Sequence, residues 1–228
     1  MSIIILSIAI LIFSIIVHEV AHAWMAYKLG DPTAKNLGRL TLNPIPHIDL
    51  FGSILLPLFF VMTGSNFLLA WAKPVPYNPY MIRDKKYGDL KVSIAGPGSN
   101  IILAIIFGLL ARFLPITAEL KSSLIVSYFS ANYDLILSSM AGNLLVVVFV
   151  MSIIFCFLNL LLAFFNLVPI PPLDGSKIIA NFLPAKAKMK FFMFERYGMF
   201  VLLFFIMFGL FRLLLYPIIK SFSLIIGV

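Results

Sequence analysis

The sequence predicts an all-α polytopic membrane protein with four to six transmembrane helices in a single domain over residues 1–228. Of its 228 residues, 62% are hydrophobic and only 11% are charged, which is typical of integral membrane proteins. The first seventeen residues carry no charge at all and are long enough to enter a bilayer. Most of the lysines and arginines lie in three short segments between apolar runs, as in the cytoplasmic loops of such proteins.

The N-terminal part of the chain predicts one transmembrane helix followed by a loop. We expect the helix over residues 2–27, because a glycine at position 30 and a proline at position 32 end it. Residues 31–49 are polar and rich in turn-forming residues, so we expect a loop there. Short β-strands are expected in the cytosolic-side loops, either at residues 38–42 or at residues 73–77.

The next apolar run, residues 50–72, leaves two alternatives open. Pro57 and the polar residues 63–66 interrupt it, so it either spans the membrane once or forms a re-entrant hairpin. Farther along the chain, we expect long helices over residues 92–114 and 142–168. A last transmembrane helix is expected at residues 197–216.

The distribution of basic residues predicts the orientation in the membrane. Segments 28–49, 73–91 and 177–196 hold most of the lysines and arginines, whereas residues 115–140 hold only one. The positive-inside rule places the three basic segments in the cytosol and residues 115–140 outside. This orientation favours the hairpin for residues 50–72, because a single span would place one basic loop outside.

The net charge of +8 raises the question of an anionic partner. Because the positive charge lies in short loops between apolar runs, anionic lipid headgroups are the expected partner and nucleic acid is not. Whether the chain forms a homo-oligomer stays open.

The sequence His18-Glu19-Val-Ala-His22 at the end of the first apolar run has the pattern of a metal site. Residues four apart lie on one face of a helix, so the two imidazoles are able to bind the same ion. Glu19 is placed to act as a general base. A polar patch at the membrane surface is the structural alternative. Three ionisable groups together in an apolar helix are costly without a function, and this favours metal binding.

A catalytic zinc site needs a third protein ligand besides the two histidines. Asp174 is the strongest candidate, because it follows a long uncharged run and three prolines break the helix just before it. Considered alone, Asp174 would be interpreted as an ordinary helix N-cap. The other candidates in the sequence are His47, Asp49, Glu119 and Asp134.

Three motifs together resemble the site-2 protease family of intramembrane zinc metalloproteases. They are HEVAH at residues 18–22, GPGSN at 96–100 and NLVPIPPLDG at 166–175. The resemblance covers about residues 15–180. It implies that His18, His22 and Asp174 bind one zinc ion and that Glu19 is the catalytic base. It also implies a role for Asn166 at the substrate or at the developing oxyanion.

The segment 38–52 is similar to the compact prokaryotic branch of that family, which carries no PDZ or CBS domain. Two further polar residues have alternative interpretations. Asn100 either binds the substrate or makes a hydrogen bond between helices. His47 is either a gate or extra ligand at the site, or a residue with contacts only in its own loop.

The resemblance implies hydrolysis of peptide bonds within or near the transmembrane helices of single-span proteins. Anti-sigma factors and remnant signal peptides are the substrates that it suggests. The site would face the cytosol in a multi-pass protein of a prokaryotic cell membrane. The alternatives are a metal-ion transporter, which would be expected to show internal repeats, and a non-catalytic zinc-containing scaffold, which would favour four closed ligands.

Overall fold

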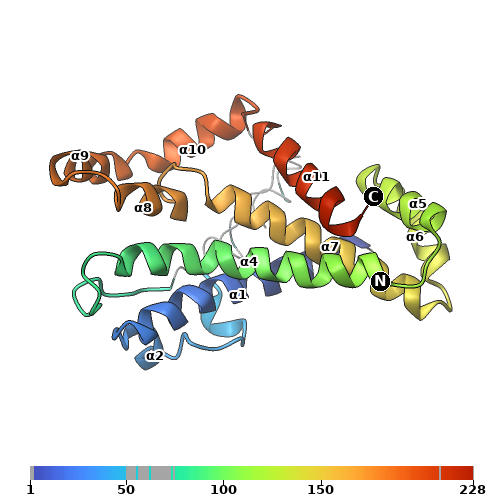
Figure 1. Cartoon of the computed structure of the whole chain (residues 1–228), viewed down its shortest axis with the longest axis horizontal. Helices are drawn as coiled ribbons and strands as arrows, with labels where there is room; N and C mark the ends of the chain where they lie inside the picture. Colours follow the sequence, from blue (N-terminus) through green and yellow to red (C-terminus); the bar gives the residue numbers. More distant parts are fainter. Residues whose placement is uncertain are drawn as a thin grey trace.

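The computed structural model describes residues 3–49, 55, 62, 73, 75–210 and 212–227, and these residues form helices and loops without a β-strand. Figure 1 shows an elongated arrangement of helices. In chain order they are α1 (Ile3–Lys28), α2 (Thr33–Asn36), the short 3-10 helix η1 (Ile45–His47), α4 (Gly88–Phe113), α5 (Ala118–Phe129), α6 (Tyr133–Met140), α7 (Leu144–Asn166), α8 (Asp174–Ala180), α9 (Ala185–Glu195), α10 (Gly198–Met207) and α11 (Arg212–Ile226).

The predicted all-α membrane fold is confirmed. Within the described residues, α1, α4 and α7 are long and apolar enough to cross a bilayer. The surfaces of α1 and α4 turned away from the other helices carry many exposed isoleucines, for example Ile4, Ile8, Ile102 and Ile106. In water these side chains would be costly, whereas a bilayer provides the apolar environment that they require.

Helix α4 lies between α1 and α7 and packs against both, while α11 covers α4 and α7 (Figure 1). Small residues allow this close packing, as they do between many membrane helices. Ala104 and Ala111 of α4 are fully buried. At Gly108, a Cβ atom would collide with Ile225 of α11 and contact Cys156 of α7.

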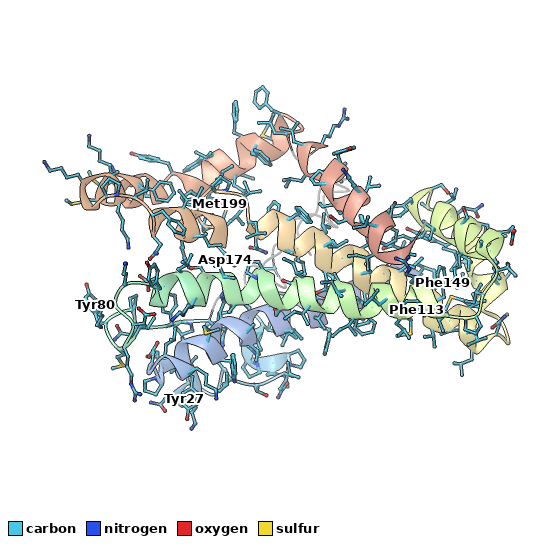
Figure 2. All side chains as sticks on the ribbon, in the orientation of Figure 1. Tyr27, Tyr80, Phe113, Phe149, Asp174 and Met199 are labelled. Carbon is cyan, nitrogen blue, oxygen red and sulfur yellow. The ribbon has the colours of Figure 1, made fainter. Side chains whose placement is uncertain are left out.

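The shorter helices lie in two groups at opposite ends of the molecule. In Figure 1, α2, α8 and α9 lie toward one end of the molecule, and α5 and α6 lie at the other. Figure 2 shows Asp174 at the end of α8 that faces α4, far from Phe113 at the C-terminal end of α4. Because α8 packs against α4, the residue that begins α8 is held beside the helices of the core.

The prediction of a strand at residues 38–42 is wrong, because these residues form turns and bends. The backbone N–H groups of Gly38 and Arg39 donate to carbonyls of α2, at Lys35 and Ala34, and so continue the end of that helix. Gly38 adopts the left-handed conformation that this ending requires (φ +66°).

The described residues of segment 73–77 form no strand either. The Val75 N–H donates to the Glu19 carboxylate of α1, and the Lys73 N–H donates to the His47 carbonyl. These bonds join segment 73–77 to α1 and to the loop that follows it. The re-entrant hairpin expected at 50–72 lies outside the described residues, except for the isolated positions 55 and 62.

The expected single span at residues 197–216 is wrong, because the chain forms two shorter helices, α10 and α11, there. Gly209 lies between them in a left-handed conformation (φ +68°), which ends a helix. Residues 115–140, for which the sequence made no clear prediction, form α5 and α6. Ala131 adopts a positive φ of 56° in the turn between those two helices.

Candidate metal centre

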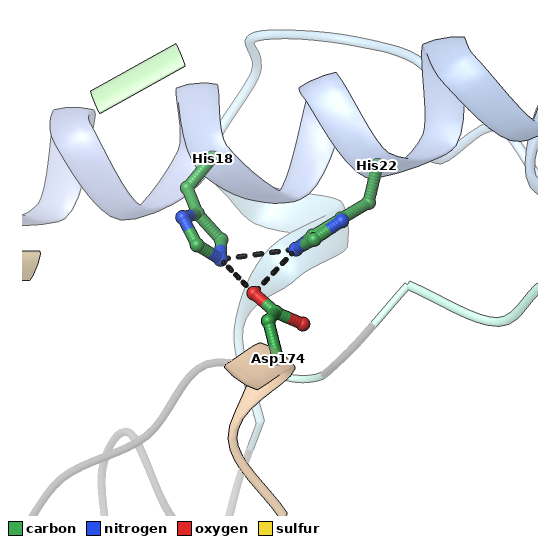
Figure 3. A group of neighbouring side chains, drawn as sticks. All are labelled: His18, His22 and Asp174. Atoms are coloured by element: carbon green, nitrogen blue, oxygen red, sulfur yellow. Dashed lines mark hydrogen bonds and ion pairs between the residues drawn. The ribbon is translucent and has the colours of Figure 1, made fainter. Parts of the chain in front are cut away.

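His18 and His22 lie one turn apart on α1 and present their rings on the same face. Their Nε2 atoms are 3.0 Å apart, and the ring planes are nearly perpendicular, at 82°. His18 is buried and His22 is partly buried. The helical spacing predicted from the sequence therefore places both imidazoles at one point (Figure 3).

Asp174 reaches the same point from the other part of the chain. Its Oδ2 atom lies 3.0 Å from Nε2 of His22 and 3.1 Å from Nε2 of His18 (Figure 3). Helix α7 ends at Asn166, and the prolines that follow allow α8 to begin in a new direction. Gly175 is needed at this corner, because a Cβ atom there would collide with the Leu167 carbonyl oxygen.

The N-cap interpretation of Asp174 is wrong. Asp174 is the first residue of α8, Leu173 holds the cap position, and no side chain caps this helix end. The Asp174 carboxylate is directed at the two imidazoles instead. Burial raises the pKa of this carboxyl group. Where the two imidazoles are protonated, they lower its pKa by more than burial raises it.

The other ring nitrogen of each histidine determines which nitrogen carries the proton. Nδ1 of His18 lies 2.6 Å from Oδ1 of Asn100, and Nδ1 of His22 lies 2.7 Å from the Val92 carbonyl oxygen. Each of these oxygens accepts hydrogen bonds and donates none. In the neutral imidazoles Nδ1 is therefore the donor, and the lone pair of Nε2 points toward Asp174.

The chemistry of the three converging ligand atoms, two imidazole nitrogens and one carboxylate oxygen, fits a zinc ion. Two nitrogen lone pairs and a carboxylate oxygen within about 3 Å of one another repel unless a cation lies among them. In a tetrahedral zinc site with bonds of about 2.0–2.1 Å, the ligand atoms are about 3.3 Å apart. Within the described residues, His18, His22 and Asp174 are the group whose donor atoms converge in this way.

The backbone of α4 forms one wall of this centre. A Cβ atom at Gly96 would collide with Nε2 of His22 and lie 2.6 Å from Nε2 of His18. Gly96 therefore allows the α4 backbone to lie directly against the two imidazoles. At Gly98, by contrast, a Cβ atom would meet nothing within 4 Å.

Glu19 lines the cavity beside the three converging side chains. This cavity has a volume of about 140 Å³, and Asn166, Tyr77 and Lys177 also line it. The Glu19 carboxylate accepts a hydrogen bond from the Val75 N–H, at 2.8 Å. Glu19 is thus beside the centre without being one of the three convergent groups, as a general base requires.

Asn166, Asn100 and His47, which the sequence singled out, have different environments. Asn166 lines the cavity, and its amide donates to the Leu162 carbonyl one turn earlier. Asn100 makes the predicted hydrogen bond between helices, since its amide oxygen contacts His18. Nε2 of His47 bonds to the Thr41 carbonyl, at 2.9 Å, in its own loop. His47 is not among the convergent donors.

Sequence reasoning missed two polar residues connected to the centre. Ser14 of α1 and Asn159 of α7 are both fully buried and belong to the hydrogen-bond network of Asn100. The position of Asn159 within a long uncharged run was a usable signal, because a buried amide in a membrane helix is costly without a partner.

Comparison with known proteins identifies relatives that are described as zinc metalloproteases. The sequence profile of peptidase family M50 matches residues 6–209. A protein of Bacillus subtilis (strain 168) with the name "Putative zinc metalloprotease YwhC" is 40% identical over 193 residues, which are 85% of this chain and 76% of the relative. The Rip2 protein of Mycolicibacterium smegmatis, whose name also describes a zinc metalloprotease, is 32% identical over 45% of this chain and 38% of its own length. No solved structure shows a significant match.

Proposed function

The chain belongs to peptidase family M50, the site-2 protease family of zinc metalloproteases, and from this premise we propose that it cleaves other proteins inside the membrane. The bonds that it hydrolyses lie within or near the transmembrane helices of single-span substrates. One observation carries the proposal: His18, His22 and Asp174 converge beside Glu19 in one cavity among helices that are able to cross a bilayer. These three residues hold one zinc ion per chain.

The roles of the side chains follow from their chemistry. Zinc at this centre supplies a Lewis acid that stabilises the negative charge developing on the scissile carbonyl oxygen. Glu19 accepts a proton from the attacking water and returns it to the leaving amide nitrogen. The Val75 N–H holds one oxygen of the Glu19 carboxylate, which keeps this base at the wall of the cavity.

The size of the cavity determines the form in which a substrate binds. An α-helix with its side chains is about 10–12 Å wide, and a cavity of about 140 Å³ does not hold it. A helix also hides its carbonyl groups in internal hydrogen bonds. The substrate must therefore unwind locally, and an extended stretch of its chain enters beside Val75 and Tyr77.

Charge supports a multi-pass orientation with the centre near the cytosol. The basic segments 28–49, 73–91 and 177–196 adjoin α2, α8 and α9, which lie at the end of the molecule opposite to α5 and α6 (Figure 1). By the positive-inside rule, this distribution of charge favours a cytosolic position for that end. Lys28 lies over the ring of Trp24 and Lys35 over that of Tyr27, an arrangement typical of the headgroup region.

The natural substrates that the family suggests are anti-sigma factors and remnant signal peptides in a prokaryotic cell membrane. Both are single-span segments that become substrates once another protease has shortened them. Anionic lipid headgroups are the partners of the basic loops.

The test is Glu19→Gln in the full chain, reconstituted in lipid with a model single-span substrate. We expect zinc content to stay unchanged and cleavage to fall by at least about 100-fold, because the variant lacks the proton acceptor. Glu119→Gln, on α5 at the opposite end, is the matched control and retains cleavage. Full cleavage by Glu19→Gln would refute the assigned base. Zinc transport into liposomes by a parent protein without proteolytic activity would favour the metal-ion transporter.

A further inference from the structure

A continuous line of polar side chains runs from the centre into the apolar core. It consists of His18 and Ser14 of α1, Asn100 of α4 and Asn159 of α7. Ser14, Asn100 and Asn159 are all completely buried. Amide groups at this depth in a membrane protein are costly, and they persist where they are fully hydrogen-bonded and serve a site.

The orientation of the line is determined where it meets the backbone of α7. The amide nitrogen of Asn159 lies 2.9 Å from the Phe155 carbonyl oxygen, which accepts and never donates. The same nitrogen donates to the Ser14 hydroxyl at 2.9 Å, and that hydroxyl donates in turn to the Ile10 carbonyl at 2.8 Å. Two backbone carbonyls therefore determine which way the Asn159 amide faces.

The orientation of the Asn159 amide determines that of the Asn100 amide. The amide oxygen of Asn159 points at Asn100, so Asn100 must present its nitrogen there, at 2.8 Å. The Ser14 carbonyl, at 3.4 Å, faces the same nitrogen and supports this orientation. A rotated Asn100 amide would set its oxygen against two other oxygens. The Asn100 oxygen is left to face His18, at 2.6 Å from Nδ1.

We propose that Asn159 and Ser14 act through Asn100 as positioning residues that keep the proton of His18 on Nδ1 and its Nε2 lone pair directed at the zinc site. This inference rests on the proposed function only in that Nε2 is a metal ligand. None of the three residues touches the reacting atoms. Their effect is to select one tautomer and one ring orientation of His18, which raises the affinity of the site for the ion.

His22 provides a comparison within the same molecule. Its Nδ1 is held by the Val92 carbonyl of the α4 backbone, which no side-chain substitution removes. The line of polar side chains therefore acts on His18 and not on His22. A general loosening of the fold would affect both histidines, whereas the proposed role affects His18 only.

The first experiment measures the tautomers directly. The full chain in lipid nanodiscs, with 15N-labelled histidine, has only three imidazoles to assign. In the zinc-free parent at pH 8, we expect the proton of His18 on Nδ1. In Asn100→Leu, which has no acceptor, we expect a large fraction of His18 with the proton on Nε2 and an unchanged His22. Asn100→Asp keeps an acceptor for Nδ1 and restores the parent tautomer.

The second experiment measures zinc affinity by competition with a chelator. We expect Asn100→Leu to bind zinc roughly 10- to 100-fold more weakly. Asn159→Leu and Ser14→Ala should show progressively smaller losses, because each is separated from His18 by one more hydrogen bond. Asn100→Asp, which keeps an acceptor for Nδ1 but sets its second oxygen against that of Asn159, should have an affinity between those of Asn100→Leu and the parent. Ser152→Ala, which removes a buried hydroxyl of α7 outside the line, is the matched control with parental affinity.

The results separate this inference from the proposed function. If His18 keeps its proton on Nδ1 in Asn100→Leu, or if His22 shifts equally, the positioning role is overturned. Should Asn100→Leu fail to fold, the tautomer of His18 in Asn159→Leu decides the question in the same way. A parent protein without proteolytic activity would refute the proposed function, whereas the tautomer measurement would still test the positioning role.

Discussion

Nε2 of His22 lies 3.0 Å from Oδ2 of Asp174, although 152 positions separate these residues in the chain. The contact joins helix α1 to the short helix α8. Helix α4 makes this possible, because it packs against both α1 and α8. The centre therefore depends on the packing of three elements, and we expect it to be sensitive to substitutions at residues that bind no metal.

The contact of α4 with the imidazoles predicts that Gly96→Ala damages the centre. The added methyl group collides with Nε2 of His22 and must push the two rings or the helix apart. We expect zinc affinity and cleavage to fall by at least about tenfold, since small displacements of ligands are costly at metal sites. Gly98→Ala, two residues away, meets open space and is the control. Equal losses in both variants would point to helix α4 as a whole.

The position of Asp174 predicts that Asp174→Ala loses the metal as well as the activity. Two imidazoles alone bind zinc weakly, and the variant lacks the negative charge that offsets the charge of the ion. We expect less than one zinc per ten chains after dialysis and no measurable cleavage. Metal analysis of purified protein checks this prediction. Asp134→Ala, at an exposed position of α6, keeps its zinc. A fully loaded Asp174→Ala variant would exclude the carboxylate as a ligand.

A third prediction concerns Asp31, a fully buried carboxylate in the loop after α1. It accepts hydrogen bonds from the N–H and hydroxyl groups of Thr33 and from the Asn78 N–H, at 2.6 Å. Asp31→Ala leaves these donors unpaired, at a cost of about 1–3 kcal/mol each where they stay buried. We expect the Asn78 and Val75 amides to exchange with deuterium at least about tenfold faster. Because Val75 holds Glu19, cleavage should also fall.

The control for that substitution is again Asp134→Ala, which removes an exposed acid far from the loop. Hydrogen exchange followed by mass spectrometry reports on both proteins in the same lipid. Unchanged exchange at Asn78 in Asp31→Ala would show that the loop does not depend on this carboxylate.

Metal removal gives a fourth prediction. A zinc chelator should stop cleavage and lower the thermal stability of the parent, and added zinc should restore both. Zinc that binds the folded state at 1,000 times its dissociation constant contributes about 4 kcal/mol. Glu19→Gln should lose stability on chelation as the parent does, although it is inactive throughout. A chelator-insensitive melting temperature would contradict a zinc ion held between α1 and α8.

Much of the fold was predictable because membrane helices obey simple rules. The first helix was expected at residues 2–27 and is α1, Ile3–Lys28, since an uncharged run in a bilayer must satisfy its own backbone hydrogen bonds. The expected helix at 142–168 is α7, Leu144–Asn166, for the same reason. The break at Gly209 was missed, because hydropathy does not report a change of direction between two apolar segments.

The sequence by itself determined the class of the protein and the residues of the candidate site. The spacing of His18 and His22 is a local property of a helix, and the combination of motifs identified the family. Only the tertiary structure decided that Asp174 meets the histidines rather than capping α8, and that the Asn100 amide oxygen lies against Nδ1 of His18. The reason is that such contacts depend on how α1, α4, α7 and α8 pack, and no pattern within one segment encodes the distance to another.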